Sequence, residues 1–244
     1  MIIVAGPCGA ESREQVMSTA IALADKGVDL FRASVWKPRT RYGTFEGVGE
    51  RGLEWLAEVR RRTGMAVTTE INLPSSVDLL VKHGIDVAWI GARSSCNPFL
   101  MNEFAHALAG SGLRVMVKNP ICADLELWIG AIERLQKAGV ENITTIHRGF
   151  VEHSYCGPYR NAPIWEIATE FIKRVGPSVP LLTDPSHIAG RADLVEQVAR
   201  EGLKRGSSGL MVECHCSPKQ ALSDAAQQLT PDEFGEMIKR LAHD

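Results

Sequence analysis

Short apolar runs alternate along the whole chain with longer stretches in which apolar residues recur at helical spacing. Each run is almost continuously apolar, which is typical of strands that are buried on both faces of a parallel sheet. The eight runs that we interpret as strands cover residues 2–6, 28–34, 65–69, 87–92, 113–117, 142–146, 179–183 and 209–212.

Helical patterns fill the intervals between these runs. Trp128 and Ile132 fall on one face of the fifth helical interval, and Thr230 with Glu233 forms a capping box that starts the last one. A strand followed by a helix, eight times without a linker, predicts a single (β/α)8 TIM barrel that comprises residues 1–244.

A reactive polar side chain follows each run. The C-terminal ends of the strands of a parallel barrel meet at one mouth, where the active sites of such barrels lie. The longest intervals, 36–49, 148–160 and 214–230, would lie at the same mouth. We therefore expect an enzyme with one pocket that collects these side chains. They are Cys8, Lys37, Glu70, Arg93, Lys118, His147 with Arg148, Asp184 with His187, and Glu213.

Composition narrows the class of protein. The formal net charge is only −2, which gives no electrostatic reason to expect a nucleic acid or an anionic membrane as partner. No apolar stretch reaches the 18 or so residues of a spanning helix, and the N-terminus does not resemble a signal peptide. The six cysteines show no disulfide framework, so we interpret them as reduced thiols of a cytoplasmic protein.

Four of the side chains near the expected mouth offer a mixed set of sulfur, nitrogen and oxygen donors. They are Cys8, His187, Glu213 and Asp224. Such a set suits a divalent Mn, Fe, Co or Zn ion better than Mg or Ca, which prefer oxygen ligands. No local zinc-binding spacing is present, so this prediction depends on the barrel geometry. A buried structural thiol for Cys8, a packed imidazole for His187 and a helix cap for Asp224 remain alternatives.

Six cations form a second set at the ends of the expected strands. They are Arg32, Lys37, Arg39, Arg93, Lys118 and Arg148. Arginine binds carboxylates and phosphates through two parallel hydrogen bonds, so converging arginines indicate a substrate with several negative charges. Glu70 could orient the lysines or position a water, and its simplest alternative role is an ion pair.

Cys214, His215 and Cys216 are adjacent and could suggest a zinc site. Neighbouring side chains on an extended strand point to opposite faces, so Glu213 and His215 would share one side and the two cysteines the other. A second pair of cysteine or histidine ligands is also missing. We therefore leave both cysteines out of the predicted metal set.

Seven motifs resemble, in order and spacing, those of 3-deoxy-D-arabino-heptulosonate 7-phosphate (DAHP) synthase. They are AGPCGAES (5–12), WKPRT (36–40), GARS (91–94), VKNP (117–120), HRGF (147–150), DPSH (184–187) and ALSDAAQQL (221–229). The resemblance covers essentially the whole chain. It is greatest to the short microbial branch, in particular to the form that some bacteria fuse to chorismate mutase.

The resemblance implies that phosphoenolpyruvate condenses with erythrose 4-phosphate and releases phosphate, the first step of the shikimate pathway. It assigns the four mixed donors to the metal. It assigns phosphoenolpyruvate to Arg93, Lys118 and Arg148, and the aldose phosphate to Arg39 and Thr40. We further expect substrate contacts from Arg32 and Asp184. Lys37, Glu70 and His187 are the residues that we expect to take part in catalysis.

Rival functions share parts of this pattern. The sister synthase uses arabinose 5-phosphate to make 3-deoxy-D-manno-octulosonate 8-phosphate, but it carries a KANRS-like stretch where this chain has residues 37–40. A non-catalytic phosphate-binding barrel and a metal-dependent hydrolase are more distant alternatives. As partners we expect further copies of the chain, in a dimer or tetramer, and a separate chorismate mutase.

Overall fold

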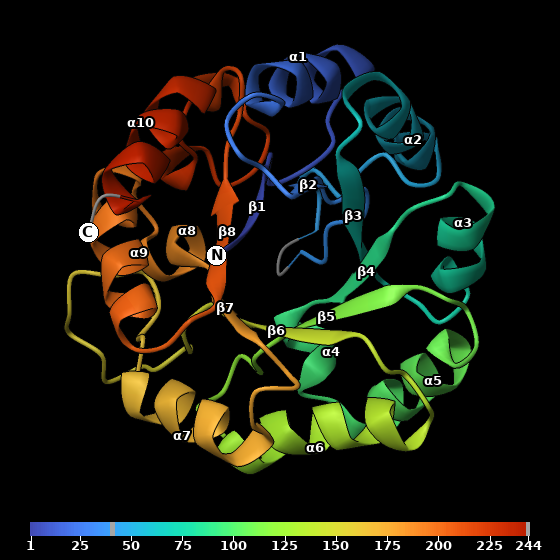
Figure 1. Cartoon of the computed structure of the whole chain (residues 1–244), viewed down its shortest axis with the longest axis vertical. Coiled ribbons are helices and arrows are strands. Elements are labelled where there is room, and N and C mark those ends of the chain that lie inside the picture. The colour runs from blue at the N-terminus through green and yellow to red at the C-terminus, as the bar shows by residue number, and fades with distance from the viewer. Residues whose placement is uncertain (40–41, 243–244) are drawn as a thin grey trace.

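The computed structural model describes residues 1–39 and 42–242. Within these residues, eight parallel strands follow one another around a closed barrel, and β1 pairs with β8 to complete it (Figure 1). The strands are β1 (Ile2–Gly6), β2 (Leu30–Arg32), β3 (Ala66–Ile71), β4 (Val87–Ile90), β5 (Arg114–Lys118), β6 (Ile143–His147), β7 (Leu181–Thr183) and β8 (Gly209–Glu213). The predicted (β/α)8 barrel is confirmed.

Helices surround the strands (Figure 1). They are α1 (Arg13–Leu23), α2 (Arg51–Thr63), α3 (Ser76–Lys82), α4 (Ala92–Ser95), α5 (Pro98–Leu108), α6 (Leu125–Lys137), α7 (Trp165–Val175), α8 (Pro185–Ala189), α9 (Val195–Lys204) and α10 (Pro231–Ala242). The longer helices form an outer ring, and the short helices α4 and α8 lie inside this ring, close to the strands (Figure 1). Short 3-10 turns are η1 (Ala192–Leu194), η2 (Pro218–Gln220) and η3 (Ala225–Gln227). None of the helices in the described part of the chain is long and apolar enough to cross a membrane.

The expected capping box starts α10. The backbone N–H of Glu233 donates to Thr230 Oγ1 at 3.2 Å, and Glu233 Oε2 accepts from the Thr230 backbone N–H at 2.7 Å. These two bonds satisfy backbone donors that the first turn of a helix would otherwise leave unpaired.

Three strands are shorter than the apolar runs that predicted them, among them β4, where the run 87–92 becomes Val87–Ile90. The run 28–34 becomes Leu30–Arg32, and the run 179–183 becomes Leu181–Thr183. Just before β2, the Asp29 backbone N–H still donates to the Ile3 carbonyl at 2.9 Å, but the Ile3 N–H donates at 2.8 Å to the Asp29 side chain instead of to a backbone carbonyl. Apolar residues on either side of a strand can thus remain buried without being part of it.

Side chains alternate between two apolar layers. One layer fills the inside of the barrel with residues from seven of the eight strands, two of them from β4. They are Val4, Leu30, Val87, Trp89, Met116, Ile146, Leu182 and Met211. The larger layer lies between the strands and the helices and includes Ala5, Val117 and Val212. This alternation arises because successive side chains of a strand point to opposite faces of the sheet.

The inward face continues beyond the apolar filling as a polar layer at the mouth. Arg32, Lys118 and Glu213 each follow an inward apolar residue by two positions, and so do Arg148 and Asp184. The fold therefore places these charged side chains directly above the apolar filling of the barrel.

Candidate active site

A pocket of about 540 Å³ lies at the mouth of the barrel. Strand ends and the loops that follow them line this pocket. Its charged and polar lining residues are Lys37, Arg39, Thr44, Glu70, Arg93, Lys118, Arg148, Arg160, Asn161, His187 and Asp224. The mouth thus brings together five of the six predicted cations. The sixth, Arg32, lies beneath them and is 1% exposed.

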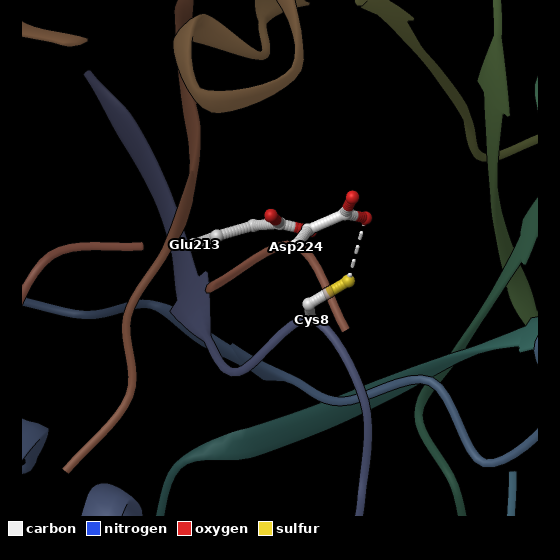
Figure 2. A group of neighbouring side chains, drawn as sticks. All are labelled: Cys8, Glu213 and Asp224. Carbon is white, nitrogen blue, oxygen red and sulfur yellow. Dashed lines mark hydrogen bonds between the residues drawn. The ribbon is translucent and has the colours of Figure 1, made fainter. Parts of the chain in front are cut away.

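Three of the four predicted metal ligands form one cluster. Cys8 follows β1, Glu213 ends β8, and Asp224 lies in the loop before η3 (Figure 2). One potential ligand atom from each lies within 4.8 Å of the others. Asp224 adopts a left-handed backbone conformation with φ of 49°, which is uncommon outside glycine and is often found at functional sites.

His187, the fourth predicted ligand, lies beside this cluster rather than within it. Its Nδ1 is 2.8 Å from Asp184 Oδ2 and 3.7 Å from Glu213 Oε1. The carboxylate of Asp184 therefore orients the imidazole, and the other ring nitrogen remains as the potential ligand. A carboxylate on the remote nitrogen of a metal-binding histidine is a common arrangement.

The chemistry of these residues fits a divalent transition metal. Glu213 is fully buried, and its Oε1 has no hydrogen-bond partner among residues 1–39 and 42–242. The guanidinium of Arg32 is 3.3 Å away and partly compensates this oxygen. Cys8 Sγ donates to Asp224 Oδ2 at 3.2 Å (Figure 2). The thiol proton therefore lies between two atoms that could both be metal ligands. The cluster is therefore a candidate metal site.

Burial and charge shift the titration of this cluster. The pKa of Cys8 is raised to about 12, first by burial and then by the charge of Glu213. Burial alone would lower the pKa of Lys37, but the negative charges of Cys8, Glu213 and Glu70 outweigh it and leave that pKa raised. Lys37 Nζ lies 2.9 Å from Cys8 Sγ, so the ammonium group can stabilise a thiolate when the proton leaves.

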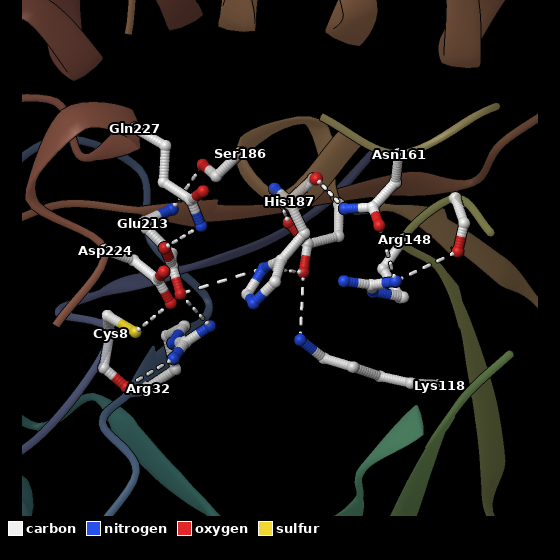
Figure 3. A network of polar contacts seen from close by, with 12 residues as sticks. Cys8, Arg32, Lys118, Arg148, Asn161, Ser186, His187, Glu213, Asp224 and Gln227 are labelled. Carbon is white, nitrogen blue, oxygen red and sulfur yellow. Dashed lines mark hydrogen bonds and ion pairs between the residues drawn. The ribbon is translucent and has the colours of Figure 1, made fainter. Parts of the chain in front are cut away.

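The predicted anion binders form a second region of the pocket. Lys118 Nζ pairs with Asp184 Oδ2 at 3.0 Å, and Arg148 Nη1 donates to Asn161 Oδ1 at 3.1 Å. Burial lowers the pKa of Arg148 to about 10, which leaves it charged near neutral pH. Figure 3 shows His187 between this region and the thiol–carboxylate cluster. Cations that are held in place next to a metal site can bind a substrate that carries a carboxylate and a phosphate.

Glu70 lies at the floor of the pocket. Its Oε2 accepts a hydrogen bond from Trp89 Nε1 at 3.1 Å, and the Arg32 guanidinium lies 4.7 Å from the Trp89 ring centroid. A Cβ on Gly91 would lie 2.1 Å from Glu70 Oε1, so the carboxylate occupies space that only glycine leaves free. Trp89, which belongs to the apolar filling of the barrel, thus also orients Glu70.

His147 does not belong to the pocket, and its inclusion among the mouth side chains was wrong. Ile146 points into the barrel, so His147 points outward, where it is fully buried against Trp128 and Trp165. Burial lowers its pKa to about 4. The inward neighbour on the other side, Arg148, is the residue that reaches the mouth.

The remaining predicted residues have defined places. Arg39 lines the pocket and donates from Nε to the Phe45 carbonyl at 2.6 Å. Thr40 lies outside the described residues. Cys214 is buried in the outer apolar layer and Cys216 is exposed, in agreement with their exclusion from the metal set.

Sequence reasoning missed several polar residues that organise the site, including Asn161, which accepts from Arg148. Arg160 lines the pocket and pairs with Asp224 at 2.8 Å. Gln227 donates to Glu213 Oε2 at 2.7 Å, and Asn119 Oδ1 accepts from the Arg148 backbone N–H at 2.7 Å. Asn119 and Gln227 lie inside motifs that carried the family resemblance, which was the available signal. Arg160 lies ten residues after the nearest of these motifs, which ends at Phe150, so the sequence carried no signal for it.

Comparison with known proteins agrees with this geometry. A family model described as the DAHP synthetase I family matches residues 1–243. The chain belongs to the DAHP synthetase I family.

Relatives in this family carry two related names. Phospho-2-dehydro-3-deoxyheptonate aldolase of Thermotoga maritima is 34% identical over 98% of this chain and 68% of its own length. A 2-dehydro-3-deoxyphosphooctonate aldolase of Nitratidesulfovibrio vulgaris is 30% identical over 98% of this chain and 90% of its own length.

Solved structures show the same fold. The crystal structure of the Thermotoga maritima DAHP synthase aligns with a TM-score of 0.88 and 31% identity, covering 100% of this chain and 68% of that one. A truncated form of the same enzyme aligns with a TM-score of 0.85 and 30% identity, covering 86% of its chain. The chain therefore shares both the sequence pattern and the barrel of this family of enzymes.

Proposed function

We propose that this protein is a DAHP synthase, which condenses phosphoenolpyruvate with erythrose 4-phosphate to give DAHP and phosphate. The observation that carries the proposal is the joint location of a thiol–carboxylate cluster and converging cations in one pocket. The cluster suits the carbonyl of an aldose, and the cations suit the carboxylate and phosphate of phosphoenolpyruvate.

Phosphoenolpyruvate is bound by Arg93, Lys118 and Arg148 in this proposal. Lys118 is oriented by Asp184 and Arg148 by Asn161, so neither cation needs to reorganise when the anion enters. Such preorganisation lowers the entropic cost of aligning the two reactants. Arg39 and Thr40 are the proposed binders of the aldose phosphate, and Arg32 supports the floor of the pocket.

The bond changes follow from the reactivity of the enol. C3 of phosphoenolpyruvate attacks the aldehyde carbon of erythrose 4-phosphate, and the aldehyde oxygen takes a proton. Water adds at the electron-poor C2, and breakage of the bond between C2 and the phosphate oxygen releases inorganic phosphate. Lys37 and Glu70, which line the pocket, are the proposed residues that hold this water, and His187 is a further candidate for proton transfer.

A divalent Mn, Fe, Co or Zn ion bound by Cys8, His187, Glu213 and Asp224 would supply Lewis-acid activation of the aldehyde. Removal of the metal by a chelator should abolish activity, and addition of Mn should restore it. Full turnover by the metal-stripped protein would contradict the proposed metal dependence.

The aldose substrate is tested by phosphate release. The protein is incubated with phosphoenolpyruvate and either erythrose 4-phosphate or arabinose 5-phosphate, and each product is identified by mass. We expect a clear preference for the four-carbon aldose. A preference for arabinose 5-phosphate would reassign the protein to the octulosonate branch, whose named relative is nearly as similar as the first.

Assembly and location also remain proposals. The lower end of the barrel carries a cavity of about 510 Å³ whose lining mixes apolar residues such as Met1 and Met116 with charged ones such as Asp29, Arg114 and Glu141. We expect a homodimer or tetramer in which subunit contacts cover apolar surface. Light scattering coupled to gel filtration measures the oligomeric state, and a monomer would contradict this. The proposed cytoplasmic location rests on the cysteine pattern and on the N-terminus, which does not resemble a signal peptide. The proposal of a separate chorismate mutase as partner rests on the resemblance alone. Co-purification of the mutase, with inhibition by prephenate only in its presence, tests the partner.

A further inference from the structure

Each carboxylate of the candidate metal site uses one oxygen within the protein and leaves the other toward the cluster. Asp224 Oδ1 accepts from Arg160 Nη1 at 2.8 Å, whereas its Oδ2 faces Cys8 Sγ at 3.2 Å. Glu213 Oε2 accepts from Gln227 Nε2 at 2.7 Å, whereas its Oε1 is buried without a hydrogen-bond partner among the described residues and lies 3.3 Å from Arg32 Nη1. The two carboxylates thus present one oxygen each.

The two groups that occupy the outer oxygens are themselves joined. Arg160 Nη1 also donates to Gln227 Oε1 at 2.9 Å. The amide of Gln227 is therefore oriented by Arg160 at its oxygen and by Glu213 at its nitrogen. Figure 3 shows Gln227 next to Glu213, on the side of the carboxylate away from Cys8. Gln227 is 1% exposed, so its bond to Glu213 is shielded from water, whereas the Arg160 side chain is 49% exposed.

The backbone around Arg160 is attached to the helix that carries His187. The Arg160 N–H donates to the Ala189 carbonyl at 3.2 Å, and the Asn161 N–H donates to the Ile188 carbonyl at 3.2 Å. A Cβ on Gly190, which ends α8, would lie 2.4 Å from the Arg160 Cβ, so the loop packs against α8 without room for a side chain there. Arg160 therefore connects the β6–α7 loop, α8 and the loop of Asp224.

We propose that Arg160 and Gln227 form a clasp that restricts Asp224 and Glu213 to one metal-facing oxygen each and thereby selects small transition-metal ions. The proposal rests on the proposed function, because it takes the cluster to be a metal site. Ca²⁺ takes six to eight oxygen ligands, often with carboxylates that bind through both oxygens, and a clasped pair cannot supply them. Arg160 and Gln227 are positioning residues in this proposal and do not touch the ion.

Cobalt binding to the purified, chelator-treated protein tests the clasp without measuring turnover. Co²⁺ is added in increments, and absorption is followed for the thiolate-to-cobalt band and for the weaker visible bands that report coordination number. Affinity is measured by competition with a chromophoric chelator. The variants are Arg160→Ala, Arg160→Lys and Gln227→Leu, and Arg174→Ala is the control because Arg174 pairs with Glu126 on the outer helices.

We expect Arg160→Ala and Gln227→Leu to weaken Co²⁺ binding by about 10- to 100-fold, the usual effect of removing an outer partner of a metal ligand. The visible bands should weaken as the released carboxylates bind through both oxygens, and Ca²⁺ should compete better than in the unmodified protein. Arg160→Lys should restore part of the affinity, because its ammonium group can still reach one carboxylate. Arg174→Ala should match the unmodified protein.

The outcomes separate the clasp from the proposed function. An unmodified protein without a thiolate-to-cobalt band contradicts the metal site itself and with it the proposed metal dependence. A normal band in the unmodified protein, together with unchanged affinity and spectra in both the Arg160 and the Gln227 variants, overturns the clasp. Circular dichroism checks folding of each variant, and Gln227→Leu, which keeps the side-chain volume, tests the Glu213 arm even if Arg160→Ala does not fold.

Discussion

Replacing His147 by leucine should make the stability of the protein less sensitive to acid. The His147 ring is fully buried between the barrel and the outer helices, with ring centroids 6.3 Å from Trp128 and 5.0 Å from Trp165. Burial disfavours the imidazolium and lowers the pKa of His147 from 6.5 to about 4 in the folded protein. Leucine has a similar volume and carries no titratable group.

The sign of the effect follows from proton binding. Between pH 6.5 and 4 the unfolded chain takes up a proton at His147, whereas the folded chain does not. The contribution of this residue to stability is therefore complete above pH 6.5 and is lost as the pH falls toward 4. At about 1.4 kcal/mol per pH unit, the loss amounts to about 3 kcal/mol.

Urea unfolding at several pH values between 8 and 4 measures this difference. Carboxylates elsewhere also destabilise the protein in acid, so the informative quantity is the difference between His147→Leu and the unmodified protein at each pH. We expect it to shift in favour of the variant by about 3 kcal/mol from neutral pH to pH 4. His106→Leu, on the exposed face of α5, is the control for loss of an imidazole. A difference that stays constant over this range would refute the assignment of His147 to the apolar layer.

Two further predictions concern the mouth of the barrel. In the metal-free protein, alkylation of Cys8 should accelerate about tenfold per pH unit up to about pH 11, because the pKa of its thiol is raised to about 12. A plateau near pH 9, the ordinary pKa of a thiol, would contradict this. Gly91→Ala should displace the Glu70 carboxylate from its place beside Trp89 and reduce kcat at least tenfold, because the added Cβ would lie 2.1 Å from Glu70 Oε1. Unfolding in urea should change little, since the Gly91 φ of −72° is open to alanine, and an unchanged kcat would argue against a role for Glu70.

The pattern of apolar residues predicted the barrel well because parallel strands that are buried on both sides leave a strong local signal. β1 matches the first run exactly in extent, and the other strands differ by one or two residues at either end. Strand order around the barrel followed from the same signal, because consecutive strand–helix units add strands at one edge. Most of the mouth residues could be named for the same reason, since each is attached to the end of a strand.

His147 was wrongly placed at the mouth because the alternation of side chains along β6 was not taken into account. Both His147 and Arg148 lie at the end of the run that predicted β6. Neighbouring side chains of a strand point to opposite faces, so only one of the two can face inward. Ile146 belongs to the apolar filling of the barrel, so Arg148 reaches the pocket and His147 packs outward. The alternation that separated Glu213 from Cys214 would have separated these two residues as well.

The helices and strands, their order, and the residue types at the mouth of the barrel could all be predicted from the sequence. They depend on contacts between residues that are near neighbours in the chain. Only the tertiary structure decided that Arg160 pairs with Asp224 and that Gln227 holds Glu213. The first pair joins loops that are 64 residues apart in the sequence. Which oxygen of a carboxylate faces the cluster depends on the relative placement of such loops, and closure of the barrel between β1 and β8 fixes that placement.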